Sequence, residues 1–149
     1  MGPLNIPDGS RLLLDSMCII YAVEEVCPYV DLLTEVFQGI DDGRYGCVLS
    51  PLVTTEVLAR PLRNGDALLA RRFRTMLGNL RDARMVPFDL SVAERAADIR
   101  ARYGLRTPDA IHVATALHAG CTHILTNDRA WQRVTECAVV VLQDVVAAP

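Results

Sequence analysis

Lysine is absent from this sequence of 149 residues, and all fifteen of its cationic side chains are arginines. A P-loop requires a lysine that reaches the nucleotide phosphates, and Schiff-base catalysis requires a lysine amine. The missing residue type therefore excludes both of these classes, whatever the reason for its absence.

The cysteine pattern provides neither a disulfide framework nor a zinc site. The number of cysteines is five, which is odd, and no two of them stand at C-x-x-C spacing. Four of the five lie in apolar stretches of the sequence, so we expect reduced and mostly buried thiols. The five are Cys18, Cys27, Cys47, Cys121 and Cys137.

Long apolar segments are missing too. No run approaches the roughly 18 residues that span a bilayer, and residues 1–6 have neither the basic nor the apolar region of a signal peptide. Hydrophobic residues still make up 51% of the chain, enough for one domain with a substantial core. We expect a single cytoplasmic domain over residues 1–149 with no membrane association, in which residues 1–10 form a loose lead.

Short apolar runs alternate with segments of helical character. The expected strands cover residues 11–14, 47–49, 85–88, 122–125 and 138–142. The expected helices cover residues 17–26, 28–39, a segment from 51 that carries Glu56, 64–80, 92–103, 107–120 and a short turn around Trp131. Alternation of this kind is typical of an α/β fold with a central, mostly parallel sheet and helices on both of its faces.

Three helix starts carry capping signals. Ser50-Pro51 predicts an N-cap followed by a proline in the first turn. The run Ser91–Glu94 is a capping box, and Thr107 is expected to cap the helix that holds Asp109 at its second position.

Four carboxylates are placed to meet at one edge of this sheet. Asp15 follows the first strand directly, and Asp128 follows the fourth. Ligands of open parallel sheets bind outside the carboxyl ends of the strands, and the entry to the Asp109 helix faces the same edge. Glu56 is the one acid among apolar neighbours in its helix. We therefore identify Asp15, Glu56, Asp109 and Asp128 as catalytic and metal-binding candidates.

Clustered carboxylates repel one another, and a divalent cation removes that penalty. Oxygen ligands favour Mg²⁺ or Mn²⁺, which can activate a water for attack on phosphorus. No serine–histidine or cysteine–histidine pair is placed for covalent catalysis, which favours direct hydrolysis of a phosphodiester. Each acid alone also has an ordinary interpretation, as a strand-end or helix cap, a first-turn acid or a solvated helix residue. All four reaching one edge by chance is much less plausible.

At these residues the chain resembles a PIN domain, in particular the VapC-type toxin ribonucleases of bacterial toxin–antitoxin pairs. The resemblance covers about residues 11–143, and its last two blocks, with nineteen residues from Asp109 to Asp128, are the most specific. The blocks are Leu13–Ser16, Thr55–Leu58, Thr107–Ile111 with Ala114–Ala116, and Leu125–Asp128.

The resemblance implies a three-layer α/β/α domain with about five parallel strands, a Mg²⁺ or Mn²⁺ site, cleavage of RNA, homodimerisation and a small antitoxin partner whose tail covers the acidic cleft. It also implies that the hydroxyls of Ser16 and Thr126 lie close to the metal ligands. Some relatives carry a further acid where Ala130 stands here, which leaves the number of metal ions open.

Arginine is concentrated in the middle of the chain. Residues 60–106 hold eleven arginines and five acids, a net charge of +6, whereas the rest of the chain has a net charge of −9. One interpretation is a solvated helical surface, and the other is a basic flank that binds the RNA backbone. On the helix expected over 64–80, helical phase brings Arg71 and Arg74 to one side with the less securely placed Arg60 and Arg63, while Leu68 and Phe73 take the buried side.

Two further residues and two further functions stay open. His112 lies one turn after Asp109 and either assists a metal ligand or proton transfer, or packs beneath its helix, which is the commoner role. Trp131 either stacks on a base or anchors the C-terminal part of the chain.

A phosphohydrolase of the haloacid dehalogenase type also begins with an aspartate after a first strand, but Met17 and the missing lysine disfavour it. A catalytically weak RNA-binding module of the same fold is the remaining alternative.

Overall fold

The computed structural model describes residues 4–80 and 83–148. The first three residues of the predicted lead, together with Arg81 and Asp82 of the basic segment, lie outside the described residues. Residues 4–10 contain no helix or strand, and hydrogen bonds and burial attach them to the domain. Ile6 is buried, and the Gly9 N–H donates to the Arg44 carbonyl at 2.8 Å.

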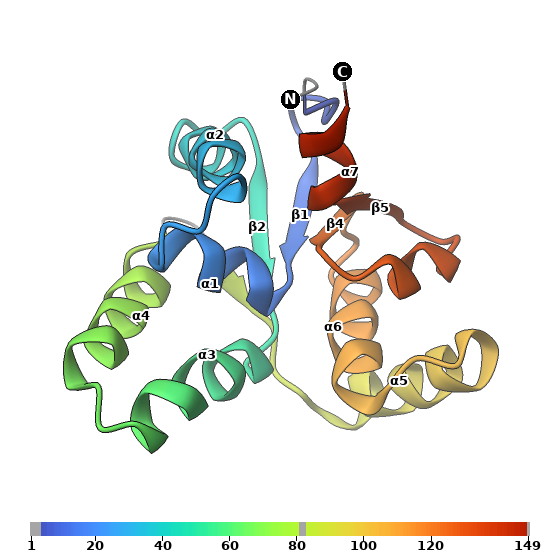
Figure 1. The fold of residues 1–149 in the computed structure, drawn as a ribbon. Coiled ribbons are helices and arrows are strands. Elements are labelled where there is room, and N and C mark those ends of the chain that lie inside the picture. Colours follow the sequence, from blue (N-terminus) through green and yellow to red (C-terminus); the bar gives the residue numbers. More distant parts are fainter. Residues whose placement is uncertain (1–3, 81–82, 149) are drawn as a thin grey trace.

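Within the described residues, five strands form one sheet in the order β3-β2-β1-β4-β5, and all neighbouring pairs are parallel (Figure 1). This confirms the predicted α/β fold with a parallel sheet of about five strands. The strands are β1 (Arg11–Leu14), β2 (Gly46–Leu49), β3 (Arg84–Met85), β4 (His123–Thr126) and β5 (Ala138–Val141). The expected strand over 85–88 shrinks to an edge strand that ends before Pro87, because proline cannot donate to a ladder.

Helices cover both faces of the sheet, which gives the three layers of the fold. Four helices and the C-terminal helix pack on one face, and two helices and a 3₁₀ turn pack on the other. The first group is α1 (Ser16–Val23), α2 (Tyr29–Asp41), α3 (Leu52–Arg63), α4 (Ala67–Asn79) and α7 (Leu142–Ala147); the second is α5 (Leu90–Tyr103), α6 (Thr107–His118) and η1 (Arg129–Arg133). Helix α7 is not predicted from the sequence, where residues 138–142 are expected to form a strand.

Alternation along the strands divides the core into these two layers. Leu12 and Leu14 of β1 pack with the α1 side of the sheet, whereas Leu13 packs with the α6 side. All three are fully buried, which is worth about 1.5–3 kcal/mol for each leucine. The four cysteines expected in apolar surroundings are buried and free, and Cys27 is exposed.

All three predicted helix caps differ from the observed cap positions by one or two residues. Helix α5 begins at Leu90, and its cap is the Asp89 carboxylate, which accepts from the Val92 N–H at 3.0 Å in place of the predicted Ser91. Helix α6 begins at Thr107, after Arg106, so Asp109 is its third residue rather than its second. Helix α3 begins at Leu52, so Pro51 takes the cap position predicted for Ser50, although the Ser50 hydroxyl accepts from the Leu52 N–H at 3.3 Å. Differences of one or two residues are common at helix ends, where the terminal turns are irregular.

Helices α1, α3 and α6 lie close together at the carboxyl end of β1 (Figure 1). In Figure 1, α1 begins where β1 ends, and α3 contacts both α1 and α6. None of the helices in the described segments is long and apolar enough to cross a bilayer.

Candidate active site

Asp15 and Asp128 follow the two central neighbouring strands, β1 and β4. Leu14 of β1 is paired with Leu125 of β4, and the Asp15 N–H donates to the Leu125 carbonyl at 2.9 Å. The parallel register therefore brings both acids to the carboxyl edge of the sheet. Asp15 is 7% exposed, and its side chain makes no capping hydrogen bond to α1. One of its carboxylate oxygens is bound by a side chain of the neighbouring strand end.

Thr126 connects these two acids. Its buried hydroxyl donates to Asp15 Oδ2 at 2.7 Å and accepts from the Asp128 N–H at 3.1 Å. Asp128 in turn caps η1, because its Oδ1 accepts from the Ala130 N–H at 2.8 Å. One oxygen of Asp128 therefore has a structural role, and Oδ2 is the oxygen left for a ligand.

Glu56 reaches the same edge from α3 and is held there by two side chains. Its Oε2 accepts from the Ser16 hydroxyl and lies 2.8 Å from Nε2 of His112. Ser16 is the first residue of α1, and His112 is on α6, so Glu56 joins helices from both faces of the sheet. The Ser16 hydroxyl, expected to lie close to the metal ligands, therefore forms a hydrogen bond with Glu56, one of the four candidate ligands.

Asp15 and Glu56 differ in their electrostatic environment. Burial raises the pKa of Asp15, with partial compensation by His112 and by the Thr126 hydrogen bond, while the nearby Glu56 charge raises it further. Burial alone would also raise the pKa of Glu56, but hydrogen bonds from His112 and Ser16 lower it overall. Mutual repulsion of the two carboxylates favours a cation between them.

Asp109 contributes from the first turn of α6. Its side chain is 15% exposed, and Oδ2 accepts from Nε of Arg106 at 3.0 Å. The Arg106 side chain is 80% exposed. Hydrogen bonding and charge attraction to Asp109 raise the pKa of Arg106, with smaller contributions from Asp128 and Glu56. Arg106 thus brings a positive charge to the acidic cluster.

All four predicted acids line one hollow of about 220 Å³. The other lining residues are Ser16, Met17, Ile20 and Arg106. Ligand atoms of Asp15, Glu56 and His112 lie within 4.8 Å of one another, which is close enough to share an ion. A donor set dominated by carboxylate oxygens fits Mg²⁺ or Mn²⁺. The predicted acids, drawn from four separate elements, are therefore gathered around a space that suits such a cation.

The sequence predicts the roles of two site residues only in part. For His112 the sequence favours packing, and the structure shows both a buried ring, 1% exposed, and a hydrogen bond to Glu56. For Arg106 the sequence indicates only a place in the basic segment, and the structure shows that it lines the acidic hollow. The position of His112, one turn after Asp109, was the only signal for the first. The position of Arg106 just before the Thr107-Pro108-Asp109 helix start was available for the second.

The four arginines predicted to bind RNA lie elsewhere. Arg63, Arg71 and Arg74 are exposed, and Arg60 forms an ion pair with Glu24. None of the four lines the acidic hollow. Arg71 instead lines a second hollow, of about 410 Å³, between α4 and the end of α1.

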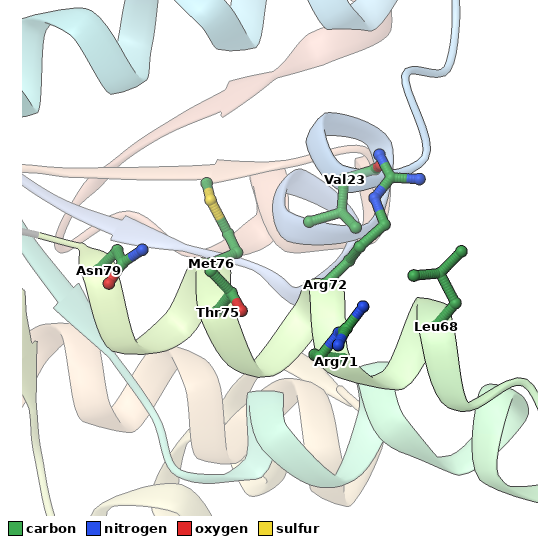
Figure 2. A pocket seen from close by; sticks show the side chains of 7 residues that line it. All are labelled: Val23, Leu68, Arg71, Arg72, Thr75, Met76 and Asn79. Carbon is green, nitrogen blue, oxygen red and sulfur yellow. The ribbon is translucent and has the colours of Figure 1, made fainter.

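This second hollow is largely apolar with a basic margin, as Figure 2 shows. Its lining residues are Val23, Leu68, Arg71, Arg72, Thr75, Met76 and Asn79. Arg72 reaches across from α4 and donates to the Val23 carbonyl at the end of α1. Leu68, predicted on the buried side of its helix, is 61% exposed. That prediction is wrong: Leu68 lies in the first turn of α4, after the Asp66 cap, and lines the open hollow instead of packing into the core.

The family comparison matches the model of the PIN domain over residues 12–136. A search of curated protein sequences finds no match to the chain.

Solved structures with the same fold come from bacterial toxin–antitoxin systems. A toxin–antitoxin complex from Klebsiella pneumoniae is 20% identical with a TM-score of 0.64, and the match covers 88% of this chain and 97% of that one. VapBC2 from Rickettsia felis, bound to a DNA fragment from its promoter, is 12% identical with a TM-score of 0.69, covering 88% and 98%. The sarcin–ricin loop cleaving toxin VapC20 from Mycobacterium tuberculosis is 13% identical with a TM-score of 0.61, covering 76% and 86%. At these identities the likeness establishes the fold.

Proposed function

Because this chain belongs to the PIN domain family, we propose that it is a metal-dependent endoribonuclease and the toxin of a toxin–antitoxin pair. The observation that carries the proposal is the hollow lined by Asp15, Glu56, Asp109 and Asp128. An RNA-cleaving toxin among the structures of the same fold supports RNA as the substrate. RNA as a substrate also supports a cytoplasmic location.

The four carboxylates are the proposed ligands of Mg²⁺ or Mn²⁺. When bound, such a cation supplies an activated water and charge stabilisation for phosphodiester hydrolysis. Thr126 fixes Asp15 through its hydrogen bond, and Ser16 and His112 fix Glu56, so these ligands are ordered in advance. Preorganised ligands of this kind bind a hard cation without a large cost in side-chain order.

Arg106 is the proposed contact to the substrate phosphate inside the hollow. Its Nε is used by Asp109, which leaves the two terminal nitrogens of the guanidinium as donors. A guanidinium held on one side by a carboxylate can bind a phosphate with the other. The exposed Arg71, Arg74 and Arg63, and Arg60 beside them, remain candidates for contacts to the more distant RNA backbone.

The second hollow is the proposed docking site of the antitoxin. Its apolar floor includes Leu68 and Met76, and Arg71 and Arg72 give its margin a positive charge. A segment with apolar side chains flanked by acidic residues complements that surface. The toxin–antitoxin complexes of the same fold support a partner of this kind. A homodimer also remains a proposal, and analytical ultracentrifugation at micromolar concentration tests it.

Cleavage of RNA in the presence of Mn²⁺, and its loss in EDTA, is the direct test of this function. We expect Asp15→Asn and Asp109→Asn to abolish cleavage, because each removes a charged ligand, while circular dichroism and the melting temperature stay close to those of the parent protein. Asp31→Asn changes an exposed acid of α2 and is the matched control, which should cleave normally. Full activity in well-folded Asp15→Asn protein would overturn the proposal. Metal-independent RNA binding without cleavage by the parent protein would favour the catalytically weak RNA-binding alternative.

A further inference from the structure

His112 is buried on α6 with one nitrogen directed at the acidic cluster. It is 1% exposed, and its Nε2 lies 2.8 Å from Glu56 Oε2. The imidazole ring also packs on Trp131, with ring centroids 5.9 Å apart and an interplanar angle of 31°. The ring is therefore fixed between a core aromatic and a carboxylate of the hollow.

The direction of the hydrogen bond follows from the surroundings of the two ring nitrogens. Nδ1 is buried and has no hydrogen-bond partner among the residues that the structure describes. A proton on Nδ1 would be a buried donor without an acceptor, which is unfavourable. An ionised carboxylate can only accept, so a proton on Nε2 satisfies both groups. His112 is therefore the donor, and Glu56 is the acceptor.

The Ser16 hydroxyl donates to this same oxygen of Glu56. Two donors, one from α1 and one from α6, thus occupy Oε2 from the two sides of the sheet. Oε1 is the oxygen that remains for a cation. One carboxylate oxygen of Glu56 lies within 4.8 Å of one carboxylate oxygen of Asp15. Ligating carboxylates are commonly oriented by such donors, and loss of one costs about 10–100-fold in metal affinity.

We propose that His112 is a positioning residue, which donates its Nε2 proton to Glu56 Oε2 and so presents Oε1 of Glu56 as a single-oxygen ligand to the divalent cation. The proposal rests on the proposed function, since it assumes a cation bound by Asp15 and Glu56. It assigns to His112 neither direct contact with the cation nor exchange of a proton with the substrate.

Two substitutions of His112 distinguish the effect of its donor nitrogen from the effect of losing the imidazole ring. The side-chain nitrogen of glutamine reaches the place of Nε2, whereas that of asparagine reaches the place of Nδ1. His112→Gln therefore keeps a donor to Glu56, and His112→Asn loses it. Isothermal titration with Mn²⁺ gives the dissociation constant without any turnover. We expect binding about 10–100-fold weaker in His112→Asn, and binding in His112→Gln close to that of the parent protein.

The fold is checked with Trp131, the only tryptophan of the chain, whose emission reports on packing against position 112. If His112→Asn does not fold, His112→Phe keeps an aromatic ring against Trp131 without a donor nitrogen and should also weaken Mn²⁺ binding. Equal Mn²⁺ affinity in the parent and in a folded variant that lacks the donor at position 112 would overturn the role of His112. Equal weakening by His112→Gln and His112→Asn would overturn it too, because a retained donor should rescue binding. Absence of Mn²⁺ binding by the parent protein would instead overturn the proposed metal site itself.

Discussion

The Thr126 hydroxyl donates a hydrogen bond of 2.7 Å to Asp15 Oδ2, across the ends of the neighbouring strands β4 and β1. Thr126 is fully buried, and the same hydroxyl accepts from the Asp128 N–H at 3.1 Å. One oxygen atom thus sets the positions of two proposed metal ligands. Its loss should affect both the stability of the fold and the site.

Thr126→Val keeps the shape of the side chain and removes this hydroxyl. The Asp15 carboxylate loses a donor and the Asp128 N–H loses an acceptor, so we expect a loss of about 1–3 kcal/mol in the free energy of unfolding. Mn²⁺ binding should weaken by about 10–100-fold, because a ligand loses the group that orients it. Urea unfolding and isothermal titration measure the two effects. Thr126→Ser retains the hydroxyl and should keep most of the Mn²⁺ affinity; if it binds no better than Thr126→Val, the hydroxyl is not the group that matters.

Arg106→Gln should weaken the binding of RNA to the acidic hollow. Loss of one phosphate contact on a single strand should reduce the slope of log affinity against log salt by about 0.7. The measurement is an RNA titration at several salt concentrations in an Asp15→Asn background, in which the substrate survives.

The control for this experiment is Arg95→Gln, which removes an equal charge from an exposed position on α5. Arg71→Glu combined with Arg74→Glu tests the basic surface of α4 in the same background, and a weaker affinity with a flatter slope is expected there too. If Arg106→Gln and Arg95→Gln have the same small effect, Arg106 contacts no phosphate. An unchanged slope for the Arg71 and Arg74 variant would assign those arginines to the solvated surface or to a protein interface.

Leu68→Asp should weaken the complex with the antitoxin while leaving RNA cleavage intact. The substitution places a charge on the apolar floor of the hollow at α4, and Leu68 is 61% exposed, so the fold should tolerate it. Co-expression of each variant with the antitoxin of the pair, followed by titration of the separated proteins, gives the dissociation constant. We expect it to rise at least about tenfold, which corresponds to about 1.4 kcal/mol.

Leu62→Asp offers a matched control, because Leu62 is 57% exposed at the end of α3 and does not line that hollow. Equal antitoxin affinity in both variants would place the antitoxin elsewhere on the domain. Loss of cleavage in Leu68→Asp alone would connect the hollow with catalysis instead.

Much of this molecule can be predicted from short stretches of its sequence. Apolar runs of four residues or fewer at residues 11–14 and 47–49 become buried strands, because alternate side chains reach opposite faces of the sheet. Acids placed directly after such strands meet at one edge, because parallel strands end on the same side. Asp15 and Asp128 therefore follow from the sequence once the strands are recognised, and the blocks around Glu56 and Asp109 complete the set through their resemblance to PIN domains.

Only the tertiary structure determined which side chains contact and orient these four acids. The His112–Glu56 hydrogen bond joins residues 56 positions apart, from helices on opposite faces of the sheet, and no local pattern encodes how closely those helices approach. The exposure of Leu68 depends on the open hollow between α4 and the end of α1, and the approach of Arg106 to Asp109 depends on the start of α6, one residue earlier than predicted. Sequence spacing fixes which residues share a strand end or a helix face, because backbone geometry repeats with a constant period. Which of them then touch depends on the packing of the side chains between the layers, and only the folded chain as a whole determines that packing.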